Sequence, residues 1–250
     1  DDAGSPDLSR GVQLWINCRM THIFALGTLI GRDGDGRLAD HGVAALSGFL
    51  RDAEHDGWWA RVDAADHTPS STDKTAYEHA FVLLAASSAA VAGRPGAREL
   101  LDGGVAVVDR HFWDDEAGAS VEQWNRDWTT LDGYRGANAN MHSVEAYLAV
   151  SDATGDPVWR HRALRIADRL INREARAHGW RLPEHYDARW RADLDYNRDQ
   201  PDHPFRPYGV TPGHGLEWAR LLLHLDAALR AEQAEAGVQD GADSHDGSNG

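Results

Sequence analysis

Two pairs of a histidine and a glutamate share one spacing in this sequence, His142 with Glu145 and His214 with Glu217. Residues three positions apart lie on one face of a helix. A carboxylate in that position can hold an imidazole in one orientation and raise its basicity. A histidine that transfers protons needs both a fixed tautomer and a pKa near neutrality. The spacing therefore indicates acid–base chemistry, although neighbouring surface residues without any role would show the same pattern.

Arg19 lies in the apolar stretch LWINCRMTHIFALG, residues 14–27. A buried arginine must be paired with an acid or must face a polar cavity. In a cavity, its planar donor fork could bind hydroxyl or anionic oxygens. Trp15, one turn earlier, could form the floor of that cavity. Tyr77 and Asn138 lie at comparable helix starts and could add hydrogen bonds.

Other chemistries have weaker support in the sequence. A histidine and a glutamate at this spacing could bind zinc or iron, but the order His-x-x-Glu reverses that of the di-iron bundles. HExxH, GxSxG and GxxxxGK[ST] motifs are absent, and Lys74 is the only lysine available for a Schiff base. We therefore expect no metal and no cofactor.

Composition narrows the class of partner. The chain has 250 residues with 40 acidic against 25 basic side chains, a net charge of −15, which is unfavourable for nucleic acid. No run of 18 apolar residues predicts a membrane span, and the start DDAGSPDLSR does not resemble a secretory signal. Cys18 is the only cysteine, which suits the cytoplasm. The ten tryptophans could stack on sugar rings or simply fill a core.

Helical periodicity dominates the chain. Ser9 is a plausible N-cap and Gly31 a plausible stop for the first helix, and Pro157 suits the first turn of another. The pattern predicts seven helices, over residues 9–31, 37–54, 72–92, 95–111, 137–153, 157–177 and 212–234. Segments 112–125 and 180–196 read as short β-hairpins in long loops.

The helices form a repeat. Units of helix, short connection, helix and long loop begin near residues 9, 72, 137 and 212, which predicts stacked helical hairpins. We therefore expect an all-α fold, an α/α barrel whose long loops gather on one side and build a site there. Residues 1–236 are expected to form a single, partial barrel domain, and residues 237–250 a flexible tail or loop.

Four segments resemble the N-acylglucosamine 2-epimerase superfamily, and within it the aldose–ketose isomerases of mannose and sulfoquinovose. They are LWINCRMTHIFALG (14–27), DKTAYEHAFVLLA (73–85), GANANMHSVEAYLA (136–149) and PGHGLEWARLLL (212–223). The resemblance implies an (α/α)6 barrel with a metal-free catalytic pocket at its centre.

The resemblance also implies residue roles. His214 would be one of two acid–base histidines that move a proton between adjacent carbons of an open-chain monosaccharide through a cis-enediolate. Arg19 would stabilise the developing oxyanion, and His142 would assist ring opening or bind hydroxyls. The sugar pocket would also contain Glu217, Tyr77, Asn138 and Trp15.

No segment of this sequence matches the C-terminal part of the family, which carries the second acid–base histidine. We therefore expect a partial barrel. The main hypothesis is a cofactor-independent isomerase of the D-mannose/D-fructose type. The alternatives are a sulfoquinovose isomerase, a 2-epimerase of N-acylglucosamine or cellobiose type, and an inactive sugar-binding fragment. Glycoside hydrolysis would need paired carboxylates at the helix starts, and the sequence shows none. The oligomeric state cannot be inferred from these residues.

Overall fold

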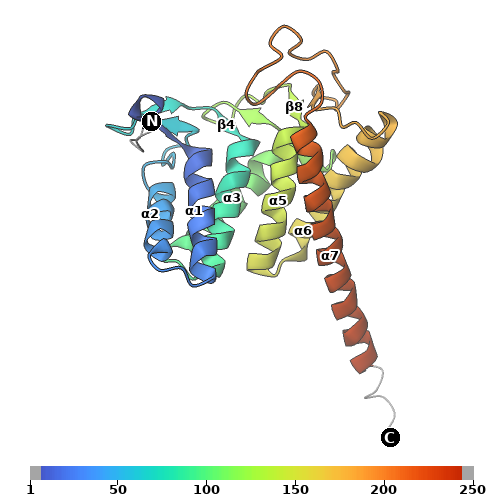
Figure 1. The fold of residues 1–250 in the computed structure, drawn as a ribbon, viewed down its shortest axis with the longest axis horizontal. Coiled ribbons are helices and arrows are strands. Elements are labelled where there is room, and N and C mark those ends of the chain that lie inside the picture. Colours follow the sequence, from blue (N-terminus) through green and yellow to red (C-terminus); the bar gives the residue numbers. More distant parts are fainter. Residues whose placement is uncertain (1–6, 244–250) are drawn as a thin grey trace, which may run out of the picture.

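The computed structural model describes residues 7–243, most of which form helices arranged as hairpins. Four helices pack side by side in an inner row, and three helices pack against its outer side (Figure 1). The inner row consists of α1 (Leu14–Leu29), α3 (Ala76–Val91), α5 (Ala137–Thr154) and α7 (Pro212–Asp243). The outer helices are α2 (Asp35–Ser47), α4 (Ala97–Val107) and α6 (Pro157–Ala167).

The sequences of the helices explain their places. Helices α3 and α5 are buried on nearly all sides, and both are rich in alanine and other small residues that allow close approach to neighbours. The side chain of Thr75 accepts a hydrogen bond from the backbone of Glu78 and caps α3. Asp156 caps α6 in the same way, just before Pro157. No helix within residues 7–243 has the length and apolar character needed to cross a membrane.

All seven predicted helices are confirmed, but several ends differ. The first helix begins at Leu14 and not at Ser9, because Val12 and Gln13 form a strand. Helices α4 and α6 continue into wider π-helical turns, η2 (Val108–Phe112) and η3 (Asp168–Ala175). Helix α7 runs to Asp243, past the predicted end near residue 234. The tail expected from residue 237 is therefore helical as far as Asp243, and residues 244–250 lie outside the described part.

Short strands lie at the N-terminal ends of the inner helices (Figure 1). β1 (Val12–Gln13) precedes α1, β4 (Lys74–Thr75) precedes α3, and β8 (Arg135–Gly136) precedes α5. Each pairs antiparallel with a strand from a later loop, respectively β2 (Arg61–Val62), β7 (Gln123–Trp124) and β9 (His185–Tyr186). β2 also pairs with β3 (Pro69–Ser71). These strand pairs fix where α1, α3 and α5 begin.

The two predicted hairpins fared differently. The first is confirmed in part, because β5 (Trp113–Asp114) pairs with β6 (Ala119–Ser120) across a turn. The second, over residues 180–196, was wrong. There only β9 is a strand, and it pairs with β8 while Tyr186 makes a single bridge to Ala192. The extended backbone before α5 offers a free edge, and the backbone of Ala137 also donates to the carbonyl of Glu184 at 2.9 Å.

Candidate active site

The sequence-predicted site residues occupy equivalent positions on the inner helices. Trp15, Tyr77 and Asn138 are the second residues of α1, α3 and α5, and His214 is the third residue of α7. All four therefore lie in first helical turns, at the end of the row where the strands and long loops gather (Figure 1). The long loops therefore gather on one side of the fold, as the repeat predicts (Figure 1).

A second layer lies one turn deeper, around a cavity of about 200 Å³ that we call the Arg19 cavity. Its walls come from the sixth and ninth residues of each inner helix, because positions three apart share a face. Together with Ile23, these wall residues are Arg19, His22, Phe81, Leu84, His142, Glu145, Glu217 and Arg220. The four inner helices therefore present one shared surface, to which Arg19, His142 and Glu217 all belong.

Arg19 is held between aromatic rings. Its guanidinium carbon lies 4.5 Å from the ring centre of Phe81 and 5.5 Å from that of Trp15. Cation–π contacts of this kind stabilise a guanidinium without neutralising its charge. The buried Nε of Arg19 has no hydrogen-bond partner within residues 7–243, and no ion pair involving Arg19 forms there. This part of the chain thus gives Arg19 a cavity and not the buried ion pair considered from the sequence.

His142 contacts the glutamate one turn later, as its spacing predicts. Nδ1 of His142 lies 3.2 Å from Oε2 of Glu145, and Nη2 of Arg220 donates to Oε1 of the same carboxylate at 2.6 Å. Burial raises the pKa of Glu145, but the hydrogen bonds from His142 and Arg220 outweigh it and bring that pKa to about 2. The ring edge of Tyr77 lies against His142, with 5.2 Å between ring centres. The carboxylate of Glu145 therefore holds the ring of His142 on α5, and Arg220 on α7 holds that carboxylate in turn.

His214 has a different acid partner from the one that its spacing suggested. Nδ1 of His214 lies 3.0 Å from both carboxylate oxygens of Glu184, which directly precedes β9. Glu217 lines the Arg19 cavity and acts on His214 through charge. Burial lowers the pKa of His214, while the hydrogen bond and charge of Glu184, and then the charge of Glu217, raise it above its usual value overall. His214 is largely buried and lines neither the Arg19 cavity nor the cavity described next.

A larger polar cavity of about 420 Å³, the Tyr77 cavity, lies over the starts of α3 and α5. Tyr77 and Asn138 line it, together with residues of the loop before α7. From that loop, the ring of Phe205 contacts Trp15 and Tyr77 edge-on, with ring centres 6.3 and 5.8 Å apart. Trp15 contacts Arg19 of the first cavity and Phe205 of the second, and Tyr77 contacts His142 of the first and Phe205 of the second.

Two acids in the Tyr77 cavity are strongly perturbed. Burial raises the pKa of Glu78 and of Glu122 to about 7 in each case. Glu78 bonds to the hydroxyl of Thr75, whereas the buried Oε2 of Glu122 has no hydrogen-bond partner within the described residues. Near neutral pH, both carboxyls can therefore donate a hydrogen bond as well as accept one.

Sequence reasoning missed Glu184, Glu122 and Phe205. All three lie in loops, where no helical spacing marks them. The segment PEHYD, residues 183–187, carries an acid and a histidine just before a helix-opening motif, but its pairing with the start of α5 was not visible in the sequence.

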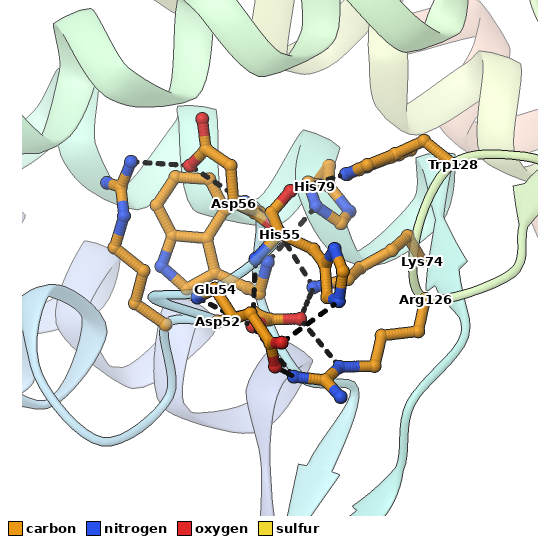
Figure 2. Close-up of polar contacts among 11 residues, drawn as sticks. Asp52, Glu54, His55, Asp56, Lys74, His79, Arg126 and Trp128 are labelled. Atoms are coloured by element: carbon orange, nitrogen blue, oxygen red, sulfur yellow. Dashed lines mark hydrogen bonds and ion pairs between the residues drawn. The ribbon is translucent and has the colours of Figure 1, made fainter.

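A separate polar network lies behind the start of α3 (Figure 2). Nζ of Lys74 donates to Oδ2 of Asp52 at 3.0 Å and to the carbonyl of Asp56 at 2.8 Å. Arg126 donates to the same Asp52 oxygen at 3.2 Å. Lys74 is fully buried, and burial lowers its pKa. We therefore interpret this buried and ion-paired lysine as a structural residue. In the described part of the chain, no three His, Cys, Asp or Glu side chains cluster as a metal site would require.

The chain has relatives among known proteins. The family model for N-acylglucosamine 2-epimerase (GlcNAc 2-epimerase) matches residues 1–244. The chain is 56% identical over 229 residues to a D-mannose isomerase of Thermobifida fusca, which covers 92% of this chain and 56% of that protein. It is 53% identical over 212 residues to a D-mannose isomerase of Pseudomonas cannabina pv. alisalensis, covering 85% of this chain and 50% of that protein.

Solved structures share the fold. A crystal structure of D-mannose isomerase matches with a TM-score of 0.81 and 33% identity, over 86% of this chain and 55% of that one. Cellobiose 2-epimerase from Spirochaeta thermophila matches with a TM-score of 0.77 and 21% identity, over 90% of this chain and 55% of that one. The predicted (α/α)6-barrel fold is confirmed, and this chain forms part of such a barrel, because it spans about half the length of these relatives. The chain belongs to the N-acylglucosamine 2-epimerase family.

Proposed function

We propose that the complete protein containing this chain is a cofactor-independent sugar isomerase that interconverts D-mannose-like aldoses and D-fructose-like ketoses. The observation that carries the proposal is the surface of the four inner helices, where Arg19, His142, Glu217 and Tyr77 meet around two polar cavities. The names of two relatives more than half identical to this chain support the same reaction.

In the proposed reaction, the open-chain aldose binds along this surface. Nε2 of His214 removes the proton at C2, the electron pair forms a C1–C2 double bond, and the carbonyl oxygen at C1 gains negative charge. The imidazole returns that proton to C1 of the resulting cis-enediolate, and the hydroxyl proton at O2 passes to O1 as the C2 carbonyl forms. Hydrogen is only relocated, so that the reaction needs no external oxidant or reductant.

The remaining side chains have supporting roles in this proposal. Arg19 has an unpartnered Nε among aromatic rings, which suits a donor that meets charge developing on oxygen. His142, fixed by Glu145, assists ring opening or binds hydroxyls. Tyr77 and Asn138 hydrogen-bond the sugar, Trp15 packs beside it, and Glu217 contributes charge below His214. His214 lies one turn before Glu217 on α7, so that the proposal places the reacting carbons between the Arg19 cavity and the start of α7.

The test is a product assay with the complete protein. D-Mannose is incubated with enzyme, and D-fructose is detected by NMR. Sulfoquinovose and N-acetylglucosamine are assayed alongside, because their conversion with no D-fructose formed would replace the proposed substrate. An epimer of the aldose without any ketose would reject isomerisation.

A further inference from the structure

One carboxylate connects three parts of the candidate active site. The side chain of Glu184 is 3% exposed, and both its oxygens lie 3.0 Å from Nδ1 of His214. Its Oε1 also accepts the backbone N–H of Thr211, just before α7, at 3.3 Å. Its backbone carbonyl accepts the N–H of Ala137, the first residue of α5, at 2.9 Å. Glu184 therefore contacts the starts of both helices as well as the imidazole.

A carboxylate removed from water in this way is costly unless other groups compensate its charge. The compensation here comes from His214 and from the backbone N–H of Thr211, just before α7, where the helix dipole also favours negative charge. The hydrogen bond uses Nδ1, so that Nε2 is the ring nitrogen left for proton exchange.

We propose that Glu184 is the positioning residue of His214, holding its ring with Nδ1 protonated and Nε2 directed to substrate. This inference rests on the proposed function, in which His214 transfers the proton. Glu184 itself touches no reacting atom in it.

The other charged groups around His214 do not offer the same contact. Glu217, on the same helix, is exposed and lines the Arg19 cavity. On α5, which packs against α7, Glu145 contacts His142 and accepts a hydrogen bond from Arg220. His185, next to Glu184, bonds through its two ring nitrogens to the hydroxyl of Tyr134 and the carbonyl of Pro207.

The experiment uses the complete protein and three isosteric variants. Glu184→Gln removes the carboxylate that contacts His214, and Glu217→Gln removes the one that acts only through charge. Glu232→Gln is the matched control, because Glu232 lies eighteen residues after His214 on α7 and its Oε2 is 3.1 Å from Nε2 of His161 on α6. The readouts are kcat and KM for D-mannose across pH, and the pKa of His214 by NMR of labelled histidine.

For Glu184→Gln we expect kcat to fall at least about tenfold with little change in KM, because orientation and tautomer of the base are lost. The carboxylate holds the pKa of His214 up, so its removal shifts the acidic limb of the pH profile to lower pH. Glu217→Gln should shift that limb less, and Glu232→Gln should leave both kcat and the profile as in the wild type. Glu184→Asp, which keeps the charge, should recover part of the shift in the limb.

An unchanged pKa of His214 in folded Glu184→Gln would overturn the inference. A lowered pKa with undiminished activity would instead retain Glu184 as the partner of His214 and reject His214 as the base. If Glu184→Gln does not fold, the comparison is made with Glu184→Asp. A pH profile of Glu184→Asp identical to that of the wild type, with kcat unchanged, would then contradict the proposal.

Discussion

The ionisable side chains of the candidate active site lie in different environments. Glu145 is held ionised by His142 and Arg220, whereas Glu122 is buried with one oxygen unpartnered among the described residues. Arg19 is surrounded by rings and keeps its charge available. These environments separate groups that stay charged at neutral pH from groups that can carry a proton, which is what sugar binding and proton transfer require.

Glu122 provides a residue-scale prediction for stability. Burial raises its pKa from the usual 4.5 to about 7. The folded state therefore retains the proton up to about pH 7, whereas the unfolded state loses it near pH 4.5, so this group destabilises the fold as pH rises between the two values. Glu122→Gln should remove that loss, worth about 3 kcal/mol above pH 7.

Urea unfolding of wild type and Glu122→Gln at pH 5 and pH 8 measures this effect. The free energy of unfolding should fall less between the two pH values in the variant. Identical pH dependence in both proteins would show that the carboxyl of Glu122 is not perturbed.

The helical elements determine which residues meet. The sixth and ninth residues of the inner helices face the same side because of the helical repeat, and the strand pairs fix where α1, α3 and α5 begin. A start shifted by one residue would rotate Arg19 or His142 by about 100° away from the shared surface. The short strands thus determine which helical side chains reach the shared surface.

The buried network around Lys74 also helps to position a helix, because it lies directly before α3 (Figure 2). The ion pair of Lys74 and Asp52 connects β4 to the loop after α2. β4 leads directly into α3, the helix that carries Tyr77. Lys74→Met removes one of the two charged partners of the buried Asp52 and should cost about 3–5 kcal/mol of stability. The exposed pair of Arg230 and Asp226 is the control, since Arg230→Gln should cost less than about 1 kcal/mol.

Chemical denaturation of both variants tests this prediction. If Lys74→Met proves as stable as Arg230→Gln, the network contributes nothing to the position of α3.

The helices and the His142–Glu145 contact could be predicted from the sequence, since both depend on spacing along one helix. The partner of His214 could not, because Glu184 reaches it from a loop thirty residues earlier. The pairing of β9 with β8 was also hidden, since two-residue strands have no periodicity to read. Contacts between distant segments depend on how the helices pack, and local sequence patterns do not predict that packing.

At the scale of the whole molecule, the row of helices leaves apolar side chains uncovered at its two ends. On α1, Ile16, Met20 and Ile23 are 42%, 43% and 53% exposed, and on α7, Leu216 and Leu223 are 76% and 71% exposed. Contiguous apolar surface of this kind favours association. We expect this chain on its own to self-associate at micromolar concentrations, despite its net charge of −15.

Analytical ultracentrifugation with and without Leu223→Glu checks this expectation. The variant should shift the distribution toward monomer, whereas Val158→Glu, on the outer helix α6, should not. A monomeric wild-type chain would show that these faces do not drive association.

His214 is the centre of the account, and its replacement is the most direct test. The rate of D-fructose formation from D-mannose is measured for the complete protein and for His214→Asn, with folding of the variant checked by circular dichroism. The account predicts a loss of about 10²–10⁴-fold, the usual contribution of a general acid–base group. A folded His214→Asn variant that converts D-mannose at the wild-type rate would contradict it.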